Sequence, residues 1–146
     1  MIVDASVALS WLYQRESVAE QALAQQVLAQ LPSDPAVVPA LWQWEIGNGL
    51  LMAERRRIMS AAEVADYLNR LLALPIEVDT AGPRGCLQVT LALARQYALT
   101  AYDAAYLELA VRRGSPLATF DMRLARAAAA LGLLYGADPV TGTDPL

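Results

Sequence analysis

Short apolar runs recur along this chain, and each is followed by a stretch in which apolar residues repeat with the period of a helix. Strands that alternate with helices in this way are typical of a parallel sheet with helices on both faces. We therefore expect an α/β fold, a three-layer α/β/α domain whose central, mainly parallel sheet has four to five strands. The expected strands are residues 2–3, 36–39, 75–78 and 116–120, with a short fifth near 133–135.

Local signals place the helices between these strands. Ser60 and Glu63 have the spacing of a capping box, which marks the start of a helix. Thr100 and Asp103 mark another start, and Gly114 ends that helix, because glycine readily adopts the left-handed conformation of a helix terminus. A turn is expected at Gly82 and Pro83. The expected helices are residues 6–31, about 41–58, about 61–72, 87–98, about 101–113 and about 122–131.

The composition is that of one globular domain. The chain has 146 residues, of which 56% are hydrophobic and 18% charged, enough to build a core without metal or disulfide staples. We expect a single domain over 1–135 and a loose C-terminal tail over 136–146. No apolar stretch reaches the roughly 20 residues that cross a bilayer, and no export signal precedes the first strand. With one cysteine, Cys86, these features favour a cytoplasmic protein that has no membrane partner.

Two residue types that carry much enzyme chemistry are missing. The chain has no histidine, and all 11 of its cationic side chains are arginines. This excludes Ser-His-Asp and Cys-His catalysis, histidine-ligated zinc, a P-loop lysine and Schiff-base chemistry. Carboxylates must therefore carry most of any catalysis, and a hard divalent cation is the cofactor that suits them.

Two aspartates stand where a parallel sheet binds ligands. Asp4 ends the first expected strand, and Asp121 follows the fourth. Ligands of open parallel sheets bind beyond the carboxyl ends of the strands, so both carboxylates open into one crevice if the two strands are neighbours. The alternative is that each aspartate caps the helix after it, which stabilises a helix by about 1 kcal/mol.

Two further acids lie on helices that we expect to be covered. Glu45 and Asn48 are one turn apart on a helix that is apolar on both faces. Burying an unpaired charge is costly, so Glu45 needs a partner, either Arg55 or Arg95 in an internal ion pair or, as we favour, a metal ion. Asp103 opens a strongly apolar helix that must pack close to the sheet, and its alternative role is to cap that helix.

Together these acids form a candidate metal site. Two carboxylates about 4 Å apart repel by about 4 kcal/mol at an effective dielectric near 20, so a cation has to neutralise such a cluster. Oxygen ligands select Mg²⁺ or Mn²⁺ over zinc or copper, and such a site activates water for attack on a phosphoryl group. The four acids are Asp4, Glu45, Asp103 and Asp121.

Four motifs around these acids resemble those of the PIN-domain ribonucleases, most closely the VapC-type toxins of bacterial and archaeal toxin–antitoxin pairs. The resemblance extends over nearly the whole chain, in the family's order and with family-like spacing. The motifs are residues 2–6 (IVDAS), 44–50 (WEIGNGL), 99–106 (LTAYDAAY) and 117–121 (LATFD).

The resemblance implies an endoribonuclease that depends on Mg²⁺ or Mn²⁺ and has a helix-covered parallel sheet. It implies that Asp4 and Asp103 are the main metal ligands, and that Glu45 and Asp121 bind the metal directly or through water. It also implies a homodimer and a cognate antitoxin, a segment of which covers the acidic groove. Three residues match positions where the family places small polar groups around the site: Ser6, Asn48 and Thr119.

Each of these three polar residues has a simpler alternative role. Ser6 would cap the first helix, Asn48 would support the site only indirectly, and Thr119 would be an ordinary strand residue. Two glycines beside Glu45, Gly47 and Gly49, cost about 1 kcal/mol each relative to alanine in a helix. They indicate either close packing or a local irregularity.

RNA contact requires a local basic patch, because the net charge of −4 argues against broad nucleic-acid affinity. The candidate patch is Arg55, Arg56 and Arg57. The alternative is that these side chains are solvated and complement the helix dipole. Of the three tryptophans, we expect at least two to pack in the core and an exposed one to serve partner contacts.

Two other classes of protein remain open. One is a catalytically silent PIN-fold protein that binds or regulates a partner, and the complete set of four acids counts against it. The other is a different carboxylate hydrolase, either another metal-dependent phosphoesterase or a glycosidase. A phosphatase would turn over small phosphomonoesters and ignore internal RNA bonds, and a glycosidase would work in EDTA. The RNA target, the cleavage site and the number of metal ions are left open.

Overall fold

The computed structural model describes residues 1–13, 16–81 and 83–136, without the side chains of residues 83 and 84. All strand pairs in the described sheet are parallel, and the strand order is β3-β2-β1-β4. This confirms the expected α/β/α architecture with four strands. The strands are β1 (Ile2–Val3), β2 (Ala36–Val38), β3 (Ile76–Val78) and β4 (Leu117–Ala118).

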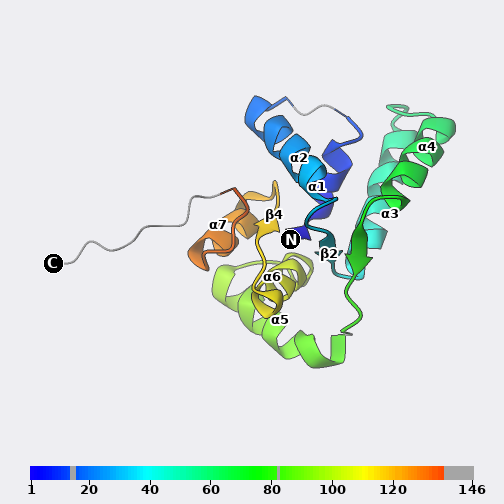
Figure 1. The fold of residues 1–146 in the computed structure, drawn as a ribbon. Coiled ribbons are helices and arrows are strands. Elements are labelled where there is room, and N and C mark those ends of the chain that lie inside the picture. The colour runs from blue at the N-terminus through cyan, green and yellow to red at the C-terminus, as the bar shows by residue number, and fades with distance from the viewer. Residues whose placement is uncertain (14–15, 82, 137–146) are drawn as a thin grey trace.

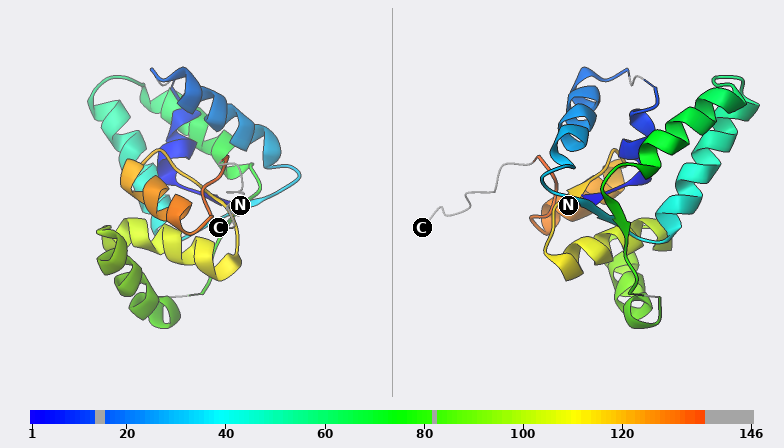
Figure 2. Two further views of the ribbon diagram at one scale, coloured as in Figure 1. Left: turned by 90° about the vertical axis from the view of Figure 1, so that its left-hand side faces the viewer. Right: turned by 45° about the vertical axis from the view of Figure 1, so that its right-hand side comes forward.

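Seven helices in the described part of the chain cover this sheet (Figure 1). The figure shows α3 and α4 side by side on one side of the molecule, and α5, α6 and α7 gathered on another, an arrangement that the two views of Figure 2 repeat. The helices are α1 (Ala5–Ser10), α2 (Val18–Gln30), α3 (Leu41–Arg55), α4 (Ala61–Leu72), α5 (Pro83–Tyr97), α6 (Ala101–Arg113) and α7 (Met122–Ala130). None of them has the length and apolar character needed to cross a bilayer.

The capping signals in the sequence predicted three helix boundaries correctly. The hydroxyl of Ser60 accepts a hydrogen bond from the Glu63 amide, and the Glu63 carboxylate accepts one from the Ser60 amide, which completes the capping box of α4. Thr100 is the N-cap of α6, and Gly114 ends that helix with φ of 57°. Glycine adopts this left-handed conformation without the steric cost of a Cβ atom.

Two expected helices and one expected strand were predicted wrongly. The helical region expected over 6–31 is two helices, because the chain turns after Ser10 and Ser17 caps a new helix. The helix expected to start at residue 87 starts at Pro83, and proline is favoured in a first turn. The expected fifth strand is reduced to one bridge between Leu117 and Leu134. Gly82 and most of the expected tail, 137–146, lie outside the described residues.

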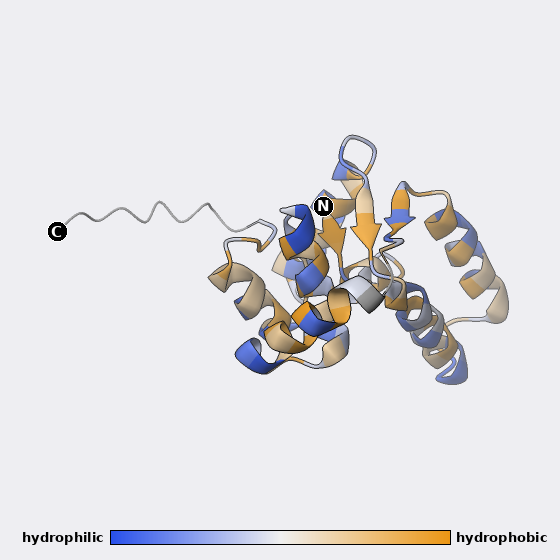
Figure 3. Cartoon of the chain, turned by 90° about the horizontal axis from the view of Figure 1, so that it is seen from below, coloured by the Kyte–Doolittle hydropathy of each residue, from blue (hydrophilic) through white to orange (hydrophobic). Residues whose placement is uncertain are grey.

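Side chains of the sheet alternate between two hydrophobic cores. Ile2 and Leu117 lie in the core that α3, α6 and α7 cover. Val3 and Ala118 lie in the opposite core, which α2 helps to close. Most of the strand residues are accordingly coloured as hydrophobic in Figure 3, and β1 and β4 are buried, whereas Glu77 of the edge strand β3 is exposed.

The strand order determines where a ligand can bind. From β1 the chain moves to β2 and β3 on one side, and it returns as β4 on the other side of β1. Such a reversal is the point at which open α/β sheets bind ligands, beyond the carboxyl ends of the strands. Asp4 follows β1, and Thr119 and Asp121 follow β4. The two strands that we required to be neighbours are paired.

Candidate functional site

Asp4 is the buried carboxylate of the site, with only 7% of its surface exposed. Although it occupies the N-cap position of α1, its side chain makes no capping hydrogen bond. Instead, its Oδ2 accepts hydrogen bonds from Ser6 Oγ (2.6 Å) and Thr119 Oγ1 (2.7 Å). The alternative role of Asp4 as a helix cap is therefore wrong.

The two hydroxyls also join the ends of β1 and β4. Ser6 Oγ accepts a hydrogen bond from the Phe120 amide (3.1 Å), and Thr119 Oγ1 accepts one from the Asp121 amide (3.0 Å). Each hydroxyl thus has its proton directed at Asp4 and its lone pairs directed at an amide. This fixes which way the hydroxyls point, so the position of the carboxylate depends on both segments.

Glu45 lies half-buried on the second turn of α3, and its Oε2 accepts a short hydrogen bond from the hydroxyl of Tyr106 on α6. No ion pair with Arg55 or Arg95, the partners considered from the sequence, occurs among those of the described residues. Sequence reasoning missed Tyr106 as a polar partner. Its spacing of three residues from Asp103, which puts both on one face of α6, was the available signal.

Burial and mutual repulsion act on the carboxylates together. Burial raises the pKa of Asp4, and the negative charge of Asp103 raises it further, against the lowering effect of its hydroxyl partners. Burial likewise raises the pKa of Glu45, as do the charges of Asp4 and Asp103, while the hydrogen bond from Tyr106 lowers it. The fold therefore brings these three acids within electrostatic reach of one another.

Asp103 and Asp121 both take part in helix capping. Thr100 Oγ1 accepts a hydrogen bond from the Asp103 amide (3.1 Å) and donates one to Asp103 Oδ2 (2.7 Å). Asp121 is the N-cap of α7, and its Oδ1 accepts hydrogen bonds from the amides of Arg123 (2.9 Å) and Leu124 (2.8 Å). Capping is therefore one role of each aspartate, and it involves one oxygen of each carboxylate.

The carboxylates of this site suit a hard cation that keeps part of its water shell better than an ion that protein ligands surround completely. In the described residues, no group of three or more histidine, cysteine or acidic side chains is arranged to surround one ion. Mg²⁺ does not require such a group, because it keeps several waters and takes one or two carboxylates. Burial is the main cause of the raised pKa values of Asp4 and Glu45, and the neighbouring negative charges add to it; a bound cation would offset both effects.

The helix that carries Glu45 is less covered than its apolar sequence suggests. Trp44 is 81% exposed, and Asn48 is also exposed. Our expectation that both faces of this helix are covered is therefore wrong. Tyr102, next to Asp103 on α6, is 69% exposed as well. One stripe of α3 is buried, made of Trp42, Ile46, Leu50 and Ala53.

Comparison with known proteins identifies the family. The model of the PIN domain family matches residues 1–130, most of the chain. This chain belongs to the PIN domain family. The PIN domain described here is 33% identical over 125 residues to Ribonuclease VapC3 of Pyrobaculum aerophilum, covering 86% of this chain and 92% of that protein. The resemblance to VapC-type PIN-domain ribonucleases is thereby confirmed.

A solved structure supports the same fold. The PIN domain is similar to the crystal structure of PAE2754 from Pyrobaculum aerophilum, with a TM-score of 0.61 and 24% sequence identity. The similarity covers 86% of this chain and 77% of that one. At this level of identity the likeness supports the fold alone.

The arginines predicted to contact RNA lie far along α3 from the acids of this PIN domain. Arg55 is ten residues after Glu45, which corresponds to about 15 Å along a helix. Arg56 and Arg57 continue beyond the end of α3, and all three are exposed. RNA contact by this patch stays a prediction.

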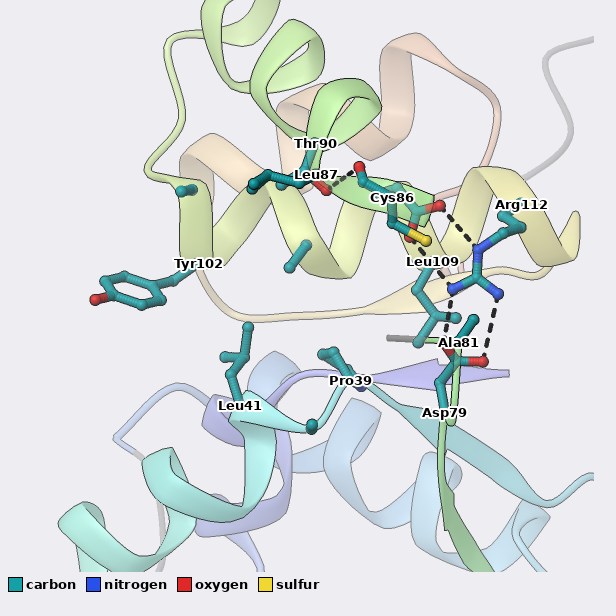
Figure 4. Close-up of a pocket in the computed structure, with 14 residues that line it drawn as sticks. Pro39, Leu41, Asp79, Ala81, Cys86, Leu87, Thr90, Tyr102, Leu109 and Arg112 are labelled. Atoms are coloured by element: carbon teal, nitrogen blue, oxygen red, sulfur yellow. Dashed lines mark hydrogen bonds and ion pairs between the residues drawn. The ribbon is translucent and has the colours of Figure 1, made fainter. Parts of the chain in front are cut away.

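Arg112 lies at one end of a cavity of about 360 Å³ (Figure 4), and both Arg112 and Arg113 have carboxylate partners within the PIN domain. Arg112 donates hydrogen bonds to Asp79 (2.7 Å) and Glu108 (2.8 Å), and Arg113 donates one to Asp79 (2.9 Å). Among the residues that line this cavity, none of the four predicted site acids occurs. The network joins the segment after β3 to the end of α6.

Proposed function

We propose that this PIN domain is a metal-dependent endoribonuclease, the toxin of a type II toxin–antitoxin pair, which hydrolyses RNA phosphodiester bonds. The observation that carries the proposal is the convergence of the Asp4, Glu45 and Asp103 charges where the strand order reverses. Negative charges that lie close together repel one another. Proteins maintain such clusters at functional sites, where a cation relieves the repulsion. The similarity to Ribonuclease VapC3 supports RNA as the substrate class.

We propose for the acids the roles that the resemblance to the PIN-domain ribonucleases implies. Asp4 and Asp103 are the main ligands of Mg²⁺ or Mn²⁺, and Glu45 and Asp121 bind it directly or through water. When bound, the cation supplies an activated water and neutralises charge on the reacting phosphate. Asn48, exposed one turn after Glu45, is proposed to support the site from the solvent side.

The neighbouring hydroxyl groups position the acids. Ser6 and Thr119 both donate to the same oxygen of Asp4, which leaves Oδ1 as the oxygen that points away from them. Tyr106 holds Glu45 from the buried side of α6. Each carboxylate is therefore oriented before a substrate or an ion arrives, and preorganised groups lose little freedom on binding.

The proposed partners, a cognate antitoxin and a second copy of the chain, are those that the family resemblance implies. An antitoxin segment that places an arginine among these acids would neutralise them without a metal. Its complex should weaken strongly when the arginines of the antitoxin are changed to glutamine, and an unchanged complex would contradict this assignment. A homodimer is also proposed, and sedimentation of the purified chain measures it.

The function is tested by incubating total cellular RNA with the purified protein in Mn²⁺, Mg²⁺ or EDTA. An Asp4→Asn variant, prepared identically, serves as the control. We expect discrete fragments with either cation and none in EDTA. Asp4→Asn should lower the cleavage rate by at least about 100-fold, because it removes a charge from the proposed cation site.

Each other outcome has a definite meaning. Equal cleavage by both preparations would show a contaminating nuclease. Turnover of small phosphomonoesters without RNA cleavage would indicate a phosphatase instead. If the protein binds RNA but cleaves none in either cation, the catalytically silent binding protein becomes the better description.

A further inference from the structure

A second cavity, of about 400 Å³, lies between the end of α5 and one face of α7. Arg123 and Arg126 of α7 line it, and because they are three residues apart they share one face of that helix. No acidic residue is among its described lining, and no ion pair of either arginine occurs among those of the described residues. The other lining residues are Tyr97, Ala98 and Ala127.

Each of the two segments that line this cavity is close in sequence to a site acid. The end of α5 leads through a short connection into the first turn of α6, where Asp103 lies. On the other side, the Arg123 amide donates to Asp121 Oδ1, and the Asp121 amide donates to Thr119 Oγ1. Thr119 in turn donates to Asp4. A continuous path of hydrogen bonds thus fixes the start of α7 relative to the buried acid.

We propose that Arg123 and Arg126 bind phosphates of the RNA strand beside the bond that is cut, an inference that rests on the proposed function. A guanidinium group binds a phosphate through two parallel hydrogen bonds and stays charged at any physiological pH. In a chain of net charge −4, the phosphate backbone is attracted only where cations gather.

The positive charge of this cavity comes from the two side chains and not from the helix terminus. The first free amides of α7 already donate to Asp121, which neutralises much of the helix dipole there. Tyr97, at the end of α5, adds an aromatic ring and a hydroxyl to the lining across from α7. A ring beside two guanidinium groups is the combination that single-stranded nucleic acid prefers, because bases stack while cations bind the backbone.

The test measures binding without cleavage. All proteins carry Asp4→Asn, and the probe is a fluorescent single-stranded RNA of about 12 nucleotides with mixed sequence. The test variant is Arg123→Gln with Arg126→Gln. The matched control is Arg70→Gln with Arg95→Gln, which removes two exposed charges elsewhere, on α4 and α5. Arg95 lies about 200° around α5 from Tyr97 and so points away from the cavity.

We expect the test variant to bind the RNA at least about tenfold more weakly, whereas the control stays within about twofold. Two lost phosphate contacts should also reduce the slope of log Kd against log salt by about 1.4. The variant with lysine at both positions should recover most of the affinity. A thermal melt checks that every variant is folded. If the glutamine variant is not folded, the RNA affinity of the lysine variant is used to test the proposal instead.

Equal weakening by the test and control pairs would overturn the inference, because net charge alone would then explain it. Binding that is unchanged in the test variant would overturn it too. If the wild-type chain cleaves RNA and the test variant binds normally, only this inference fails. If the Asp4→Asn chain binds no RNA and the wild-type chain cleaves none, the proposed function fails with it.

Discussion

Two hydroxyl groups orient the Asp4 carboxylate, while its surroundings disfavour its charged form. Ser6 and Thr119 donate to it, while burial and the charge of Asp103 raise its pKa. Groups arranged in this way reduce the stability of the fold in order to hold a charge where a ligand needs it. The free energy of unfolding should therefore increase when the charge is removed, and this is a consequence at the scale of one side chain.

Asp4→Asn should raise the melting temperature at pH 7 in EDTA. A carboxyl whose pKa is raised in the folded chain lowers stability above its ordinary pKa of 3.8, and this loss disappears as the pH falls below that value. Each pKa unit corresponds to about 1.4 kcal/mol. Melting curves at pH 7 and at pH 3.5 measure the effect. A melting temperature at pH 7 that is unchanged or lower would show that the charge is not unfavourable.

Tyr106→Phe should destabilise the fold by about 1–2 kcal/mol, because Glu45 loses a hydrogen bond to a half-buried carboxylate. Cleavage should fall as well, since the orientation of Glu45 is no longer fixed. Urea unfolding measures the first effect and RNA cleavage the second. Tyr102→Phe is the control, because Tyr102 is exposed and its change should be within about 0.5 kcal/mol.

At the scale of elements, the contact between α1 and α3 brings the segment after Asp4 close to the helix that carries Glu45. A Cβ atom added to Gly49 on α3 would lie 2.6 Å from Leu9 Cδ1 on α1, so the two helices approach closely there. A Cβ atom added to Gly47 would meet nothing within 4 Å. Close packing therefore explains one of the two helical glycines, and nothing in the structure explains Gly47.

The two glycines predict different effects of the same substitution. Gly47→Ala should stabilise the protein by up to about 1 kcal/mol, because alanine favours the helix. Gly49→Ala should be less stable than Gly47→Ala by about 1–3 kcal/mol, since Leu9 has to move. Denaturant unfolding of both variants tests this. Equal gains would mean that Leu9 adjusts without cost.

At the scale of the whole molecule, ion pairs join the edge of the sheet to α6. The side chain of Asp79, just after β3, is almost fully covered by its contacts with Arg112 and Arg113. The hydrogen bond from Arg112 is the main cause that lowers the pKa of Asp79, followed by the contribution from Arg113. This network connects the strand that is farthest from β4 to the helix that carries Asp103.

Asp79→Asn should destabilise the protein at pH 7 by about 1 kcal/mol, after allowance for solvent around the arginines. Folding lowers the pKa of Asp79. Its contribution to the free energy of unfolding is therefore fully present above its ordinary pKa of 3.8 and is lost as the pH falls through its pKa in the folded protein. Unfolding between pH 7 and pH 2 measures this. Asp66→Asn, which removes an exposed pair with Arg70, should change little, and an equally large loss there would contradict the argument.

Local patterns were sufficient for the four strands of the sheet, most helix caps and the sequence positions of the acids at strand ends. Asp4 and Asp121 could be placed because parallel strands present their carboxyl ends to one crevice. The bond between Tyr106 and Glu45 could not be predicted, because it joins residues 61 positions apart on two packed helices. The exposure of Trp44 also depends on how the helices pack, and so does the cavity beside Arg123. The spacing of apolar residues along one helix does not predict this packing.

The sequence separation of 115 residues between Asp4 and Thr119 has a consequence for synthesis of the protein. A ribosome makes β1 before β4, and the site exists only after these strands have paired. While the intervening residues are made, the growing chain carries Asp4 without the Thr119 hydroxyl that helps to orient it. For the nuclease proposed above, we therefore expect a chain that ends before β4 to have no cleavage activity.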